Sequence, residues 1–210
     1  MLTHIQHSEK VLNMRILLSI LVLIFSFQSF AKADDIRDFE IEGISIGDSL
    51  LDFFSEEEIL SQIEKNKYMY NYLTDEFGEV YKYDGLEKYF FISFRVKPKD
   101  KNFIIYGLTG TMPHTEDITE CHNQMEEIAN EFSTLFDNFE KIEDYFNHGV
   151  DKSGKSKVKE IAFVLKSNDE VRILCMDFEE NLRIENNWID GLDITLSTSE
   201  VNQWLSNHIN

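Results

Sequence analysis

The chain contains two cysteines, Cys121 and Cys175, so only one intramolecular disulfide is possible. Cys121 belongs to a stripe of apolar residues at alternating intervals of three and four, namely Ile118, Cys121, Met125, Ile128, Phe132 and Leu135. This spacing predicts an amphipathic helix whose buried face carries the cysteine. Cys175 alternates with Val171 and Ile173, which is typical of a strand with one buried face.

A disulfide between Cys121 and Cys175 would join that helix to a sheet. Because the bridge closes a long loop, it should stabilise the fold by about 4 kcal/mol. The alternative, a reactive or metal-binding pair of thiols, needs a C-x-x-C spacing that these two positions do not have. An even number of cysteines is also typical of exported proteins, because disulfides persist in oxidising compartments.

The start of the chain indicates export. Residues 16–30 form an apolar run that is preceded by Arg15 and followed by Ala31-Lys32-Ala33. A positive residue, a short apolar core and small residues before the cleavage point predict a signal peptide over residues 1–33. Met14 is a second candidate start, because residues 1–13 add nothing to this signal.

We therefore expect residues 34–210 to form a single exported α+β domain, periplasmic or secreted. The apolar run is short for a membrane-spanning helix, and no second one follows, so no stable membrane insertion is expected after cleavage. The chain has 39 acidic and 20 basic residues, a formal net charge of −19 at pH 7. This charge argues against nucleic acid as a partner, because phosphate recognition needs an excess of Lys and Arg.

Antiparallel hairpins dominate the predicted elements. We expect helices at about 55–66 and 115–136 and at the C-terminus, and strands at 39–47, 79–84, 88–97, 102–110, 140–148, 157–167, 170–178 and in the segment IDGLDITLS. This order predicts an α+β fold with an antiparallel sheet of about six to eight strands and helices packed on one face. It also suggests two units of one helix followed by three strands, with FISFRVK and EIAFVLK as the middle strands.

The segment IEGISIGDSLLDFFSEEEI, residues 41–59, resembles the opening of a family of small exported bacterial proteins of unassigned function. The Glu120-Cys121 pair and the ending SEVNQWLSN, residues 199–207, fit the same resemblance. More remotely, residues 46–53 resemble a helix start in the small lipoprotein of the outer-membrane β-barrel assembly machinery and in the β-lactamase inhibitory protein, with Asp48 where Met is usual. Those folds place a helix pair before antiparallel strands, so the resemblance implies a binding domain without catalysis.

Tyrosines gather in the middle of the chain, and they are the candidate binding residues: Tyr68, Tyr70, Tyr72, Tyr81 and Tyr83. Tyrosine presents a rigid, amphipathic surface that suits recognition of protein or glycan. We therefore expect a non-catalytic domain that binds a protein or glycan of the cell envelope. Half-buried packing of these strands and loops would explain the same tyrosines without a ligand.

Two alternative functions have weaker support. Ser45 lies in Gly43-Ile-Ser-Ile-Gly47, which matches the G-x-S-x-G pattern of hydrolases, but no strands precede it to build the parallel sheet that this motif needs. His122 and Glu126 are four residues apart on the predicted helix and could share a divalent cation, yet no third ligand follows the same spacing. We therefore assign no catalytic residue, metal ligand or cofactor from the sequence.

Overall fold

The computed structural model describes residues 35–69, 74–136 and 138–208. The predicted signal peptide, residues 1–33, lies outside them. The helices are α2 (Glu56–Met69), α3 (Ile118–Leu135), α4 (Glu180–Asn186) and α5 (Ser199–His208). The strands are β1 (Glu40–Ile41), β2 (Ile44–Ser45), β3 (Gly78–Lys82), β4 (Phe91–Val96), β5 (Ile105–Pro113), β6 (Phe139–Asn147), β7 (Lys157–Leu165), β8 (Glu170–Asp177) and β9 (Gly191–Ser197). Short 3-10 turns lie at Ile36–Asp38 and Leu50–Asp52.

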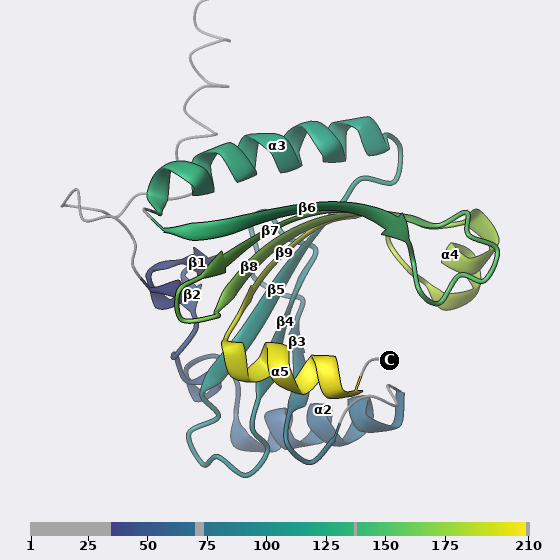
Figure 1. The fold of residues 1–210 in the computed structure, drawn as a ribbon. Coiled ribbons are helices and arrows are strands. Elements are labelled where there is room, and N and C mark those ends of the chain that lie inside the picture. The colour runs from purple at the N-terminus through teal and green to yellow at the C-terminus, as the bar shows by residue number, and fades with distance from the viewer. Residues whose placement is uncertain (1–34, 70–73, 137, 209–210) are drawn as a thin grey trace, which may run out of the picture. The chain divides into compact units, whose positions relative to one another are not determined.

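Seven strands form one antiparallel sheet in the order β3-β4-β5-β9-β8-β7-β6 (Figure 1). The α+β class and the antiparallel sheet predicted from the sequence are confirmed. The chain runs α2-β3-β4-β5 and then α3-β6-β7-β8, which is the expected order of one helix followed by three strands. Strand β9 lies between the two groups, because it pairs with β5 on one side and with β8 on the other.

One face of this sheet carries the hydrophobic core. Partner residues form apolar rows across the strands, and one such row is Val80, Phe94, Leu108, Leu196, Val171 and Phe163. Helix α3 covers the part of this face formed by β7, β8 and β9. It contributes the buried stripe Cys121, Met125, Ala129 and Phe132 to the core. The helix therefore buries the face that its apolar spacing predicts.

Cys121 and Cys175 form a disulfide that joins α3 to β8. Their Cα atoms lie 6.0 Å apart, and 54 residues separate them in sequence. Both residues are completely or almost completely buried in the core. The predicted pairing, and the prediction that it fastens the helix to the sheet, are confirmed.

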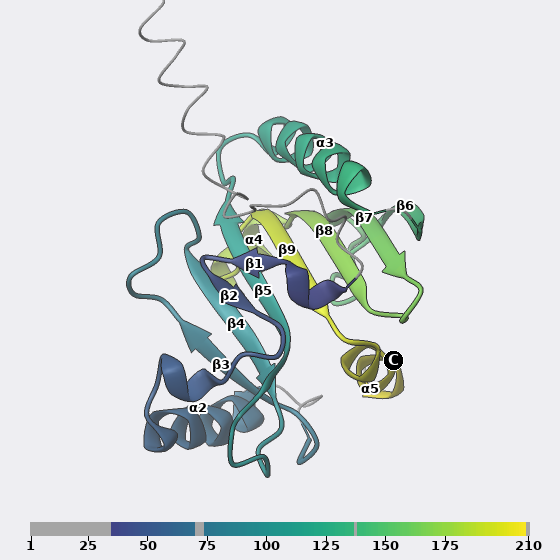
Figure 2. The same ribbon diagram turned by 90° about the vertical axis from the view of Figure 1, so that its left-hand side faces the viewer.

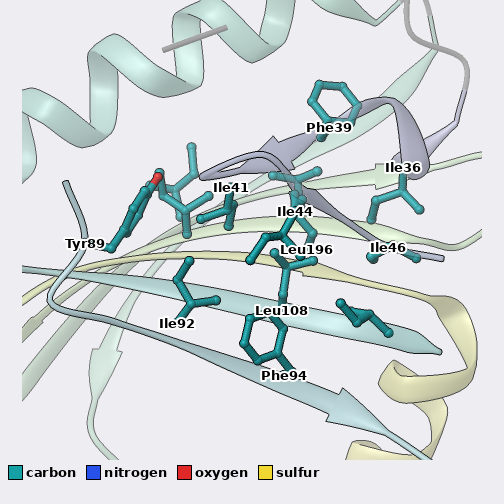
Figure 3. Close-up of a cluster of buried hydrophobic side chains, with 14 of the residues drawn as sticks. Ile36, Phe39, Ile41, Ile44, Ile46, Tyr89, Ile92, Phe94, Leu108 and Leu196 are labelled. Carbon is teal, nitrogen blue, oxygen red and sulfur yellow. The ribbon is translucent and has the colours of Figure 1, made fainter. Parts of the chain in front are cut away.

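The strand predicted at residues 39–47 is instead a hairpin of two short strands, β1 and β2. The chain reverses at Glu42 and Gly43, whose φ angles are 54° and 74°. Glycine adopts this backbone region readily, and its position allows the tight turn. The hairpin lies over the sheet on the core face (Figure 2), and its isoleucines pack above β4, β5 and β9 (Figure 3). Its Ile41 and Ile44 are 3% and 1% exposed.

A smaller apolar cluster holds α5. Val201 and Trp204 of this helix pack with Phe77, and the rings of Phe77 and Trp204 lie 5.2 Å apart. Tyr106 on β5 closes the cluster from the sheet side. In Figure 1, α5 lies on the side of the sheet away from α3, while α4 lies near the opposite ends of the strands. The two helices thus occupy separate ends of the sheet.

Candidate binding face

Alternate residues of the seven strands point away from the core and form what we call the open face. Helix α5 packs on one end of this face, where Ser197 bonds to Asn202 and where Glu79, Ser197 and Glu170 are buried. The strand register arranges them in rows, of which three cross the middle of the sheet and a fourth lies beyond them with Phe146, Val158, Met176, Gly191 and Pro113. The first row is Glu79, Arg95, Gly107, Ser197, Glu170, Val164 and Glu140. The second is Tyr81, Ser93, Thr109, Thr195, Arg172, Ala162 and Ile142. The third is Phe91, Thr111, Asp193, Leu174, Glu160 and Asp144.

The centre of the open face is polar, with Ser93 and Thr111 buried and Asp193 partly accessible. Thr109 and Thr195 are partly accessible, and their hydroxyl oxygens lie 2.9 Å apart across β5 and β9. In the next row, the Thr111 hydroxyl donates to Oδ1 of Asp193 at 2.6 Å. Apolar rows on one face and hydroxyl-rich rows on the other give the sheet one core face and one face suited to water or a ligand.

The Asp193 carboxyl is the most perturbed acid on this face. Burial raises its pKa to about 6, and the hydrogen bond from Thr111 only partly offsets this effect. A carboxyl with such a pKa exchanges its proton near neutral pH, so the charge at the centre of the open face changes with pH. On the same face, burial also raises the pKa of Glu160.

Two arginines lie among the carboxylates of the open face. Arg95 on β4 forms an ion pair with Glu79 on β3. Arg172 on β8 lies 2.9 Å from Glu170 and 3.5 Å from Glu160. The three rows contain two basic residues, which are these arginines, and six acidic ones: Glu79, Glu140, Asp144, Glu160, Glu170 and Asp193. Glu79 and Glu170 are buried and paired with these arginines, whereas Glu140 and Asp144 are exposed. The accessible charge of the open face is therefore acidic, and a cationic surface complements it best.

An aromatic cluster formed by Tyr81, Tyr83, Phe90 and Phe91 borders the open face at β3 and β4. Tyr81 and Tyr83 stack with ring centroids 6.1 Å apart, and Phe91 lies 5.6 Å from Tyr81 and 5.8 Å from Tyr83. Phe90 contacts Phe91 edge to face at 6.1 Å. Tyr83 is 59% exposed and Phe90 is 53% exposed. Large aromatic side chains with this exposure are typical of contact residues.

The structure brings together two of the five tyrosines that the sequence singled out, Tyr81 and Tyr83. Tyr68 lies in the last turn of α2, whereas Tyr70 and Tyr72 fall outside the described residues. Sequence reasoning missed Phe90 and Phe91, which complete the cluster, and the polar rows beside them. The sequence did contain a signal for the polar rows. Thr109 and Thr111 on one strand, and Asp193 and Thr195 on another, are polar residues at every second position, which is typical of a strand with one polar face.

Ser45 has a local structural role. It lies on β2, and its backbone N–H donates to Oδ2 of Asp48 at 2.8 Å, which closes the turn before the 3-10 helix. Within the described residues, no hydrogen bond connects the Ser45 hydroxyl with a histidine. The hydrolase alternative therefore has no supporting contact in this part of the chain.

The candidate cation ligands on α3 have other neighbours. Glu126 pairs with Lys159 of β7 at 2.7 Å, and burial lowers the pKa of His122. In the described ranges, no group of three or more His, Cys, Asp or Glu side chains is placed to hold a metal ion.

The Asp151 carboxylate accepts backbone hydrogen bonds from Ser153 and Ser156, both at 2.7 Å, and thereby stabilises the β6–β7 loop.

Comparison of the chain with protein-family models, with curated proteins and with solved structures finds no match. Among residues 35–69, 74–136 and 138–208, no helix combines the length and the apolar character needed to cross a bilayer.

Proposed function

We propose that this protein is an exported, non-catalytic domain that binds a partner protein through the open face of its sheet. The observation that carries the proposal is the aromatic cluster, whose exposed Tyr83 and Phe90 stand beside a polar floor. Protein interfaces combine aromatic anchors of this kind with polar groups that fix orientation. The disulfide is consistent with export, because such bonds persist in oxidising compartments.

The charge of the open face specifies the chemistry of the partner. Its rows carry more carboxylates than arginines, and the whole chain has a formal net charge of −19. The complementary surface is therefore basic, with an apolar patch that contacts Tyr83 and Phe90. Association with such a surface should be fast at low ionic strength and slower as salt screens the charges.

Crosslinking of the tagged full chain in the cells that produce it tests this proposal. The Tyr83→Ala/Phe90→Ala double variant should lose the partner protein that the wild type recovers, because truncation of central aromatic anchors weakens binding about tenfold or more. Ile184→Ala is the matched control, since Ile184 is 61% exposed but lies on α4, away from the aromatic cluster.

Two further measurements make the outcome decisive. The purified partner should bind more weakly as salt concentration rises, and its binding site should carry Lys or Arg. Equal recovery of one partner by the wild type, the double variant and the Ile184→Ala control would contradict the proposal. Recovery of a polysaccharide in place of a protein would replace it with glycan binding.

A further inference from the structure

The two edges of the seven-stranded sheet differ in how their backbone groups are satisfied. At the β3 edge, side chains of α2 bond to the strand. Gln62 accepts from the Tyr81 N–H at 2.9 Å and donates to the Tyr81 carbonyl at 3.2 Å, while Asn66 donates to the Glu79 carbonyl at 2.8 Å. These amides take the place that an additional strand would occupy.

The β6 edge has no such cover in the part of the chain that the structure describes. Strand β6 is nine residues long, and every residue after Phe139 in this strand is exposed. Its only strand partner in the described sheet is β7. Ile142, Tyr145 and Phe146 are large apolar or aromatic side chains with 43%, 62% and 38% exposure. A long, exposed edge of this kind is a template for another strand.

The register shows which backbone groups of β6 point outward. His148, which follows β6, donates to the Ser156 carbonyl at 3.0 Å, so the even-numbered residues of the strand bond to β7. The alternation of an antiparallel ladder then directs the N–H and C=O groups of Lys141, Glu143 and Tyr145 away from the sheet. The Tyr145 N–H donates to the side chain of the adjacent residue, Asp144, at 2.7 Å. This hydrogen bond must break before the Tyr145 N–H can pair with another strand.

We infer that β6 pairs antiparallel with β6 of a second copy of this chain, with Ile142 at the twofold axis. This register places Lys141 opposite Glu143 of the second copy and, by symmetry, Glu143 opposite its Lys141. Phe139 then faces Tyr145 of the second copy, and the two Ile142 side chains face each other. Within one chain, Lys141 and Glu143 already form an ion pair at 2.6 Å.

Neighbouring registers are less favourable because they bring like charges together. A centre at Glu143 places the two Glu143 side chains opposite each other, and a centre at Lys141 does the same for the two lysines. A centre at Asp144 opposes two aspartates. The register centred on Ile142 has one unfavourable kind of pair, in which Glu140 faces Asp144 of the second copy, but it gains two opposite-charge pairs and two aromatic pairs.

This pairing goes beyond the proposed function, because it uses a different edge and a different partner. It would continue the sheet, and hence the open face, from one copy into the next. Each dimer would present two aromatic clusters, and simultaneous binding of both would raise the apparent affinity for a repeated partner.

Charge exchange in the full chain tests the register. Sedimentation equilibrium at about 0.15 M salt, where long-range repulsion between the acidic chains is screened, should show a wild-type dimer. Lys141→Glu and Glu143→Lys should each raise the dimer dissociation constant about tenfold, because both cross-strand pairs change from attraction to repulsion. A one-to-one mixture of the two variants should dimerise again, as should the Lys141→Glu/Glu143→Lys double variant.

Unfolding midpoints of the single variants serve as the control that β6 itself remains folded. A wild type that stays monomeric at the highest concentration it tolerates would overturn the inference. So would a dimer that neither exchange weakens, or single variants that remain monomeric when they are mixed.

Discussion

The Gln62 side chain on α2 forms two hydrogen bonds with the backbone of Tyr81 on β3, one to the N–H and one to the carbonyl. A helical residue thereby completes the hydrogen bonding of a sheet edge. Tyr81 is only partly accessible to water, so water replaces the Gln62 side chain incompletely. Removal of that side chain therefore has an energetic cost.

Gln62→Ala should lower the free energy of unfolding by about 1–2 kcal/mol, because the Tyr81 backbone groups lose both bonds. Urea denaturation measures the change. Gln203→Ala on the exposed side of α5 is the control, since it makes the same chemical change at an exposed helical side chain. Equal midpoints for the two variants would show that the Gln62 contacts contribute nothing measurable.

Removal of the disulfide should destabilise the protein strongly. Cys121→Ala/Cys175→Ala frees a loop of 54 residues in the unfolded chain and should reduce stability by about 4 kcal/mol. Wild-type protein unfolded in the presence of a reductant should match the variant. A reductant should not change the stability of the variant itself. An unchanged urea midpoint after the double substitution would contradict the predicted contribution.

Asp193 should make stability depend on pH. Because its pKa rises from 3.8 to about 6 on folding, the folded state holds the proton more tightly than the unfolded state. The stabilisation is therefore complete below pH 3.8 and is lost as pH rises through about 6. Asp193→Asn cannot ionise and should be more stable than the wild type by about 3 kcal/mol at pH 7.5, relative to their difference at about pH 3.5.

Urea titrations of wild type and Asp193→Asn across this pH range measure that difference, in which the contributions of other groups cancel. Glu127→Gln on the exposed side of α3 is the control, because it removes the same single charge away from the open face. If the stability difference between the wild type and the Asp193→Asn variant does not change with pH, the Asp193 pKa is the same in the folded and unfolded states.

Gly110 on β5 is required by close packing. A Cβ at this position would lie 2.5 Å from two ring carbons of Tyr89 and 3.0 Å from Ile41. Gly110→Ala should therefore cost about 1–3 kcal/mol of stability, and Tyr89→Leu in the same chain should recover part of that loss. Gly107→Ala is the control on the same strand, because the nearest contacts of its Cβ would lie at 3.5 Å. A double variant no more stable than the sum of the single effects would contradict this contact.

Local signals in the sequence predicted much of the fold. The helix predicted at about 55–66 is α2, and Ser55 and Glu58 exchange hydrogen bonds at its start in the S-x-x-E pattern of a capping box. The helix predicted at 115–136 begins later, at Ile118, because the Asp117 side chain accepts from the Thr119 N–H and caps it. Helix α4 was not predicted, since its seven residues have no buried apolar stripe.

The arrangement of strands was harder to predict than their positions. Nothing local in GLDITLS shows that β9 pairs with both β5 and β8, because those pairings join distant parts of the chain. The aromatic cluster was predicted only in part for the same reason. Tyr81 and Tyr83 are close in sequence, but their contact with Phe91 depends on the pairing of β3 with β4.

The position of β9 also constrains the order of events as the chain is made. It is the last of the seven strands to be synthesised, yet the half of the sheet that contains β5 pairs with the half that contains β8 only through it. The α2-β3-β4-β5 and α3-β6-β7-β8 groups can thus form separately on the growing chain, but their strands cannot join into one sheet before β9 has emerged. Until then the inner edges of β5 and β8 have no partner strand in the described sheet.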